Sequence, residues 1–150
     1  MNEAFGEKKQ MSVIGFNFTS INAHVDDKGV TGDIRINSSP SIESVEKHDL
    51  SSVGIAEAVE IKFKFTTSYE PKAGEIEFKG NILYQVEDAK KVVKQWKDGN
   101  KVDEKLALEV LNAIFRKCLA KSVELADQLR LPPPIRFPVV TTEKPNVSGN

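Results

Sequence analysis

The sequence has little of what catalytic and structural metal sites need. It contains one cysteine, Cys118, and two histidines, His24 and His48, which are separated by a turn, a strand and a loop in the expected order of elements. A single cysteine cannot close an internal disulfide, and two separated histidines without spaced carboxylates make a poor metal or acid–base pair. We therefore expect no catalytic residues, no metal site and no cofactor, and the lone thiol suits a reducing, cytoplasmic setting.

Long apolar runs are also missing. No stretch approaches the roughly 18 apolar residues that suggest a membrane-spanning helix, and the first ten residues, MNEAFGEKKQ, lack the apolar core of a signal peptide. We expect a protein that neither enters a membrane nor is exported. With 150 residues, 39% of them apolar, the chain is long enough to bury one ordinary core. We expect a single domain at residues 12–140, between a flexible N-terminus at 1–11 and a flexible tail at 141–150.

The net charge is close to zero but is unevenly distributed. Lys and Arg total 21 and Asp and Glu total 22, so the whole molecule has no field that attracts nucleic acid or an anionic membrane. Basic residues are nevertheless concentrated around Trp96, where six lysines occur close together: Lys90, Lys91, Lys94, Lys97, Lys101 and Lys105. We interpret them as the solvated face of a short helix whose Val92, Val93 and Trp96 pack on the fold. The alternative is a nucleic-acid-binding segment at 90–105, in which Trp96 stacks a base and the lysines hold phosphates.

Alternation of apolar and polar residues predicts antiparallel strands. Residues 59–69 and 76–86 both alternate with period two, and the EPKAG sequence between them has turn chemistry, so the two runs predict a long hairpin. Residues 14–25 also alternate, but their phase changes near Thr19 and Ser20, which predicts a bulge. A turn at 26–29 followed by alternation at 30–36 predicts a hairpin of the first two strands. We interpret residues 38–52, which are rich in serine, as a loop.

A long helix is predicted after the strands. Asp103 is a suitable N-cap, and the helix should run to about Arg130, ahead of Pro132, Pro133 and Pro134. Its main apolar stripe should face the sheet. The stripe consists of Ala107, Leu108, Leu111, Ile114, Phe115, Cys118, Leu119, Leu125, Ala126 and Leu129. A second apolar row lies elsewhere on the helix: Val102, Leu106, Val110 and Ala113. Because one sheet cannot cover both, we predict that the second row is an oligomer interface.

This order of elements resembles that of the SecB-type export chaperones. The residues that carry the resemblance are the hairpin VEIKFKFTTSYEPKAGEIEFKGNILYQV, the helix LALEVLNAIFRKCLAKSVELADQL and the LPPPIRF segment, and it covers about residues 12–137. The resemblance implies an α+β fold, with a four-stranded antiparallel sheet packed against one long C-terminal helix. It also implies a non-catalytic, cytoplasmic chaperone that binds non-native polypeptides. Such chaperones form a homodimer through edge strands, or a homotetramer with the long helices between the sheets.

A groove that holds many different chains needs apolar and aromatic surface without fixed hydrogen-bond geometry. Seven residues of the first hairpin and of the segment after the helix are candidates for client binding: Phe16, Phe18, Ile34, Ile36, Leu131, Ile135 and Phe137. Core packing is the competing role for each of them.

The chain departs from the export chaperones in two respects. It is not strongly acidic, and residues 139–150 lack helical periodicity and contain Pro145, so a second C-terminal helix is not expected. SecB-like members also occur as chaperones of toxin–antitoxin systems and in archaea, so the resemblance does not imply export.

Two other function classes compete with the chaperone. Nucleic-acid binding by residues 90–105 predicts an affinity that falls steeply with salt, but the charge balance leads us to expect no nucleic-acid partner. An enzyme is the other class, because hot-dog thioesterases and dehydratases also place a long helix against an antiparallel sheet. The expected helix contains no histidine and its carboxylates lie mostly away from its main apolar stripe, so we expect no enzyme.

Overall fold

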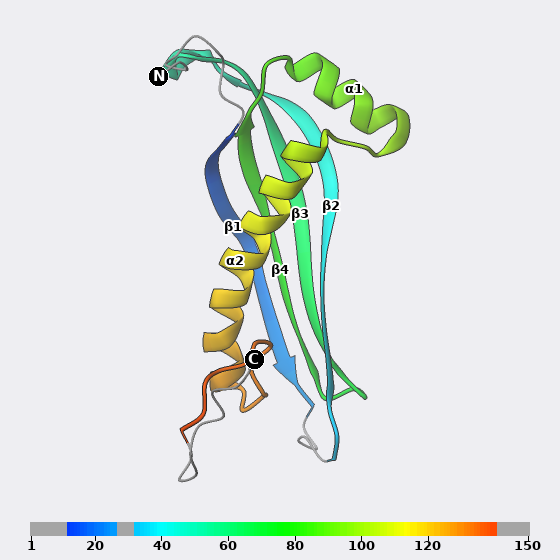
Figure 1. Cartoon of the computed structure of the whole chain (residues 1–150), viewed down its shortest axis with the longest axis vertical. Helices are drawn as coiled ribbons and strands as arrows, with labels where there is room; N and C mark the ends of the chain where they lie inside the picture. Colours follow the sequence, from blue (N-terminus) through cyan, green and yellow to red (C-terminus); the bar gives the residue numbers. More distant parts are fainter. Residues whose placement is uncertain (1–11, 27–31, 141–150) are drawn as a thin grey trace, which may run out of the picture.

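The structure, a computed structural model, describes residues 12–26 and 32–140. The elements follow one another as β1 (Ser12–Val25), β2 (Arg35–Leu50), the 3-10 turn η2 (Ser51–Val53), β3 (Ile55–Glu70), β4 (Gly74–Gln85), α1 (Ala89–Gly99) and α2 (Glu104–Gln128). The four strands form one antiparallel sheet, α2 lies across one face of it, and α1 packs at one end beside β2 and β3 (Figure 1). This is the predicted α+β fold. The termini expected to be flexible, 1–11 and 141–150, lie outside the described residues.

The predicted hairpin of β3 and β4 is confirmed. Its two strands pair in an unbroken antiparallel register that places Phe65 opposite Phe78 and Ile61 opposite Ile82. These four side chains are fully buried, because they point to the face of the sheet that α2 covers. We call this face the inner face. The intervening polar residues point to the opposite, outer face. Period-two alternation therefore builds one buried and one wetted face, as expected for an antiparallel sheet.

The strand order corrects the prediction for the first two strands. The order is β1-β4-β3-β2, so β1 pairs with β4, β2 pairs with β3, and the expected hairpin of β1 with β2 is wrong. The short connection Ser51–Gly54 keeps β2 beside β3, which leaves only the free edge of β4 for β1. The turn expected at 26–29 lies mostly outside the described residues.

The interpretation of residues 38–52 as a loop is also wrong, because most of them belong to β2. Its inward positions include Ser38 and Pro40, opposite Thr67 and Phe65. The Ser38 and Thr67 hydroxyls are hydrogen-bonded at 2.9 Å, so small polar side chains are satisfied there. Proline is tolerated because an edge strand needs hydrogen bonds on one side only. In β1, the bulge expected near Thr19 is confirmed by a shift in register between Phe18 and Ser20.

The predicted long helix is confirmed as α2. The Asp103 carboxylate accepts a hydrogen bond from the backbone N–H of Lys105 at 3.2 Å, and the helix ends at Gln128, before the three prolines. Its buried residues follow one ridge in steps of four: Leu106, Val110, Ile114, Cys118, Ser122 and Ala126, with Ala113 beside it. Cys118 is therefore a core residue, as expected, and the Ser122 hydroxyl donates to the Cys118 carbonyl at 2.7 Å.

The second apolar row of α2 is buried, and the predicted main stripe is divided. Ile114, Cys118 and Ala126 are buried as predicted, while Leu111, Phe115 and Leu119 are half-buried. Leu106 and Val110 are 0% exposed and Ala113 is 4% exposed, while Val102 is half-buried and packs on the core. These residues are covered by their own chain, so the prediction that they are an oligomer interface is wrong. Leu108, which was expected to face the sheet, is instead 55% exposed.

The lysine-rich segment forms α1, and its apolar side packs inward. Val92 is buried, and Val93 and Trp96 are half-buried against the core, which confirms the interpretation of this segment as an amphipathic helix. No helix in the described part of the chain is both long and apolar enough to cross a membrane. Across residues 12–26 and 32–140, no group of histidine, cysteine and acidic side chains is arranged to hold a metal ion.

Candidate functional site

The seven predicted client-binding residues do not form one site. Phe16 and Phe18 lie on the edge strand β1, half-buried, with their rings 5.3 Å apart. Their ring centroids lie 5.1 Å from Phe63 and 5.3 Å from Phe78, respectively, in tilted contacts. Both rings therefore pack on the core with one side and remain partly accessible at the sheet edge.

A second group lies at the end of the sheet where β3 turns into β4. Ile36 is opposite Tyr69, and the Tyr69 hydroxyl donates to the Pro132 carbonyl at 2.7 Å. Leu131 is only 4% exposed, and its backbone N–H donates to the Ala126 carbonyl at 2.8 Å. Leu131 is thus a core residue that fixes the chain after α2, while Ile34 and Ile36 remain half-buried.

The chain that leaves this anchor is apolar and exposed. Ile135 is 37% exposed and Phe137 is 50% exposed, and two residues that the sequence reasoning did not select, Val139 and Val140, are 81% and 98% exposed. We refer to residues 135–140 as the C-terminal apolar segment. The segment follows Pro132, which is hydrogen-bonded to Tyr69. Tyr69 is six residues along β3 from Phe63, which Phe16 contacts, and four from Phe65, which is opposite the Phe78 that Phe18 contacts, so this anchor is about 20 Å from Phe16 and about 13 Å from Phe18.

The outer side of α2 carries a further apolar row that the sequence reasoning had assigned to the core. We call Leu108, Leu111, Phe115 and Leu119 the outer row. Leu108 is exposed and the other three are half-buried, with the Phe115 ring meeting Phe65 edge-on at a centroid distance of 5.5 Å. The row therefore packs against the core along one side and presents apolar surface along the other.

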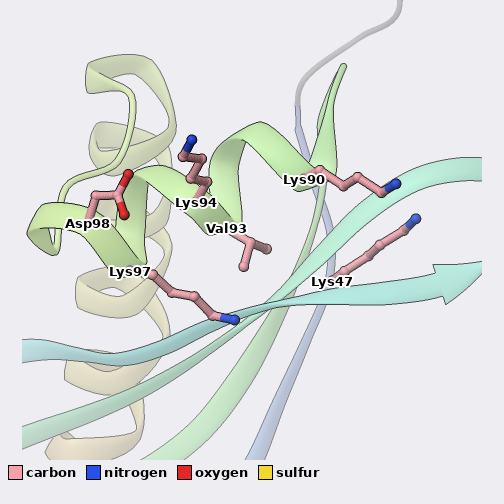
Figure 2. A pocket seen from close by; sticks show the side chains of 6 residues that line it. All are labelled: Lys47, Lys90, Val93, Lys94, Lys97 and Asp98. Carbon is pink, nitrogen blue, oxygen red and sulfur yellow. The ribbon is translucent and has the colours of Figure 1, made fainter.

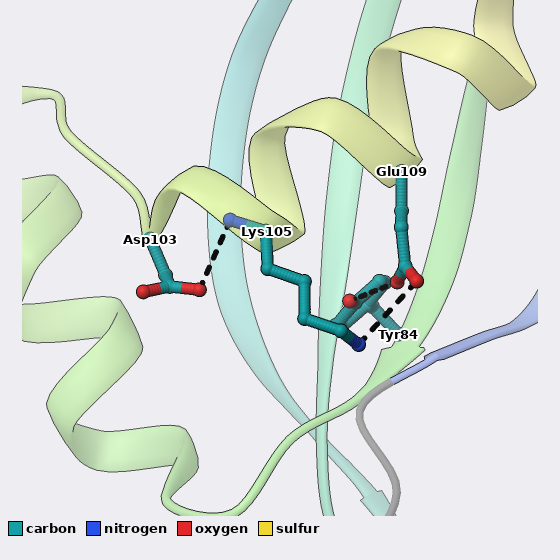
Figure 3. Close-up of polar contacts among 4 residues, drawn as sticks. All are labelled: Tyr84, Asp103, Lys105 and Glu109. Atoms are coloured by element: carbon teal, nitrogen blue, oxygen red, sulfur yellow. Dashed lines mark hydrogen bonds and ion pairs between the residues drawn. The ribbon is translucent and has the colours of Figure 1, made fainter.

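A polar network holds the start of α2 on the sheet. The Tyr84 hydroxyl, from β4, donates to the Glu109 carboxylate, whose other oxygen lies 3.4 Å from the Lys105 ammonium group (Figure 3). Asp103 caps the same turn of the helix. A hydrogen bond to a charged group is one of the stronger kinds in proteins, so this network fixes the position of the outer row relative to the sheet.

Burial raises the pKa of three groups in the core. It raises the pKa of Tyr69 from 10.0 to about 12 and the pKa of Cys118 from 9.0 to about 12. The pKa of Tyr84 is raised further, first by burial and then by its hydrogen bond to the Glu109 carboxylate. All three groups are therefore neutral at physiological pH, and Cys118 is not an activated thiol.

These shifts predict a loss of stability at alkaline pH. Above pH 9 to 10 the unfolded chain releases protons that the folded chain retains, so the free energy of unfolding falls as pH rises towards the folded pKa values near 12. Because the chain has only two tyrosines, absorbance at 295 nm reports both. We expect tyrosinate to form together with the loss of the circular dichroism signal. Tyrosinate formation at the ordinary pKa of 10.0 with the fold intact would contradict this expectation.

Neither the protein-family models nor the curated proteins provide a match to this sequence. Among solved structures, the chain matches the Mycobacterium tuberculosis SecB-like chaperone Rv1957, which was solved in complex with a ChAD peptide from the Rv1956 HigA1 antitoxin. The match has a TM-score of 0.52 at 11% sequence identity and covers 87% of this chain and 88% of the other. The fold is SecB-like. At this identity the likeness is one of architecture, and it extends over nearly the whole of both chains.

The surfaces described above can be located relative to the sheet and the long helix of the SecB-like fold. One face of its sheet is covered by α2, and both of its edges, β1 and β2, end without a further strand among the described residues. Among the described residues, four of the eight exposed large apolar side chains follow the C-terminal end of α2, and the others are Leu108 on α2, Ile14 and Ile21 on β1, and Val53. These are the surfaces on which binding can be tested.

Proposed function

We propose that this protein is a non-catalytic, cytoplasmic chaperone that binds unfolded or extended polypeptides. The observation that carries the proposal is the SecB-like fold over 87% of the chain, because the solved neighbour with this architecture holds a peptide. The exposed C-terminal apolar segment supports it, since it offers apolar side chains that residues 12–26 and 32–134 leave exposed. Apolar surface of this kind suits partners of varied sequence.

In this proposal the client contacts the C-terminal apolar segment and the accessible sides of nearby half-buried residues. Ile135 and Phe137 are the principal contacts, joined by Val139 and Val140. Ile34 and Ile36 contribute at the same end of the sheet, and Phe16 and Phe18 form a separate contact at the β1 edge. Leu131 takes no part in binding because it is buried.

We also propose that a second copy of the chain packs on the outer row of α2. The resemblance to SecB-type chaperones implies an assembly with the long helices of two dimers between their sheets, and the outer row is the side of α2 that presents apolar surface beside the buried ridge. Arg116 and Lys117 are exposed on the same stretch of the helix and provide a polar border. In this proposal the homotetramer forms through the outer row, with Leu108 as its exposed residue. This contact replaces the one through the Leu106 row that the sequence suggested.

The proposal is tested by suppression of aggregation of a chemically denatured protein, followed by light scattering. We expect wild type to suppress scattering, and an Ile135→Ser/Phe137→Ser variant to need about fivefold more protein for the same effect, because it loses apolar area that the client buries. Ile135 is 37% exposed and Phe137 is 50% exposed, so we expect the thermal unfolding midpoint to fall by only a few degrees.

Val53→Ser is the matched control for this experiment. Val53 is 67% exposed but lies in the β2–β3 connection, at the opposite end of the sheet from the C-terminal apolar segment. The Val53→Ser variant should suppress aggregation to the same extent as wild type. If wild type has no effect on aggregation, the proposed function is wrong. If the double variant and wild type act equally, the C-terminal apolar segment is not the client site.

A further inference from the structure

A second surface, distinct from the apolar residues above, lies between α1 and β2. It is a hollow of about 280 Å³, and four of the six residues that line it are lysines: Lys47, Lys90, Val93, Lys94, Lys97 and Asp98 (Figure 2). The hollow is open to solvent, and all four lysines are exposed.

The local structure explains why these lysines line one hollow. Lys90, Lys94 and Lys97 are spaced by four and three residues, which places them along one side of α1. Lys47 is opposite Val59 in the β2–β3 register, so its side chain lies on the inner face, where α1 packs. The ammonium ends of Lys47 and Lys90 point in the same direction in Figure 2.

No ion pair among the described residues neutralises the charge of the hollow. In the part of the chain that the structure describes, ion pairs join Lys105 to Glu109 and Lys121 to Glu124, and none involves the four lysines of the hollow. Asp98 is the single acidic residue that lines it, which leaves an excess of three positive charges. Lysines gathered in this way repel one another until an anion binds between them.

We propose that this hollow binds an extended polypeptide segment that carries at least two carboxylates. The inference rests on the proposed function and refines it, because it names a class of client segment that the chaperone prefers. The partner is thus an acidic peptide that also has apolar residues, which contact Val93 at the floor of the hollow.

Three features favour a polypeptide over nucleic acid as the occupant. Trp96 packs against the core, so it does not offer the free ring on which a base stacks. The adjoining hollow shares Lys47 and Lys90 but is also lined by Glu57, Glu87 and Asp88, so the positive surface is short and suits a short acidic run better than a continuous phosphate backbone. Beside the lysines, β2 is the terminal strand of the sheet, so its outer backbone groups can pair with an extended peptide.

The dimensions of the hollow indicate the spacing of the carboxylates. Lys90 and Lys97 are seven residues apart on α1, which corresponds to about 10 Å along the helix axis. In an extended chain, residues two positions apart are separated by about 7 Å and their side chains point to the same side. Two acidic residues separated by one residue can therefore reach neighbouring lysines at the same time.

The experiment compares two short fluorescent peptides by anisotropy. One has two glutamates separated by a valine within an apolar sequence, and the other has glutamines in their place. We expect wild type to bind the glutamate peptide about tenfold more tightly, with an advantage that declines as salt increases. The Lys90→Glu/Lys94→Glu/Lys97→Glu variant should lose this advantage and bind the glutamine peptide as wild type does.

A matched control carries the same change of charge elsewhere. Lys62, Lys79 and Lys101 are exposed and do not line the hollow, so Lys62→Glu/Lys79→Glu/Lys101→Glu should retain most of the preference for glutamate. Should the glutamate substitutions disturb α1, as judged by circular dichroism, Lys90→Gln/Lys94→Gln/Lys97→Gln provides a milder form of the same test.

The outcomes separate this inference from the proposed function. Equal binding of the two peptides by wild type, or an equal loss in the control variant, overturns the inference. In that case suppression of aggregation by wild type still supports the chaperone. Binding of the glutamate peptide without any suppression of aggregation overturns the chaperone but leaves the acidic-peptide site. If a single-stranded oligonucleotide displaces the glutamate peptide at lower concentration than the unlabelled peptide, the occupant is nucleic acid and the inference is wrong.

Discussion

Leu106→Glu is expected to unfold the chain, whereas Leu108→Glu should leave it folded. Leu106 is 0% exposed, so the substitution places a carboxylate in the apolar core beneath α2. We expect a loss of about 5 kcal/mol or more in the free energy of unfolding, which is comparable with the whole stability of an ordinary domain. Leu106→Ala supplies a milder version, for which we expect a loss of about 3 kcal/mol. Urea denaturation followed by circular dichroism measures these effects.

Leu108 is the matched position, two residues along the same helix but 55% exposed. Leu108→Glu should change the free energy of unfolding of the subunit by no more than about 0.5 kcal/mol, because the new carboxylate remains in water. If a second copy packs on the outer row, the mass measured by light scattering should fall in this variant. A folded Leu106→Glu protein with reduced mass would reverse the assignment and return the subunit contact to the Leu106 row.

Gly80→Ala is expected to have the second large effect. A methyl group at this position would lie 2.2 Å from the Asn17 carbonyl oxygen of β1 and 2.8 Å from the Phe63 ring. The first of these contacts is with backbone, so it cannot be relieved by a side-chain rotation. The pairing of β1 with β4 must then shift locally, and we expect the free energy of unfolding to fall by about 3 kcal/mol.

Gly15→Ala, in the paired strand, is the control for Gly80→Ala. The nearest atom to a methyl group at Gly15 is in the Leu83 side chain at 3.5 Å, which is an ordinary contact. Its stability should be unchanged or slightly raised, because alanine reduces the freedom of the unfolded chain. The urea midpoints of the two variants test the comparison. If both variants are as stable as wild type, the close approach of β1 to Gly80 is wrong.

The parts of the fold that the sequence predicted are those with a strong local pattern. The β3–β4 hairpin combines strict alternation with a turn sequence, and α2 has an N-cap at Asp103 and three prolines after its end. Each of these depends only on nearby residues, so no knowledge of the tertiary structure was needed. The bulge beside Thr19 belongs to the same class, because a change of phase is visible in the sequence itself.

The predictions for β2 and for the buried side of α2 were wrong because contacts with distant parts of the chain determine which of their residues are buried. In β2, Ser38 is acceptable at an inward position because its hydroxyl meets Thr67, which is 29 residues later in the chain. For α2, the sequence pattern predicts that one wide apolar stripe faces the sheet, whereas the buried ridge advances in steps of four. Each such step turns about 40° around the helix, so the buried side changes gradually from Leu106 to Ala126. A helix that crosses a twisted sheet obliquely is buried in this way.

The candidate site residues also differ in whether a local sequence pattern or a distant contact determines their exposure. Ile135 and Phe137 are exposed, since they follow the three prolines after the end of the helix, and their role in client binding stays a prediction. Leu131 could not be separated from them by sequence, since its burial depends on Gly74 and Ala126. The hollow between α1 and β2 was also hidden, because Lys47 joins the other lysines only through the packing of α1 on β2.

The order of the strands also bears on how the chain is made. β2, β3 and β4 pair with strands next to them in sequence, but Val25 of β1 pairs with Gly74, about 50 positions later. During synthesis, which proceeds from the N-terminus, β1 must therefore wait until β4 has left the ribosome before its backbone groups find their partners. A newly made copy exposes Phe16 and Phe18 throughout that interval. It is, for that time, an extended apolar polypeptide of the kind that we propose its finished copies bind.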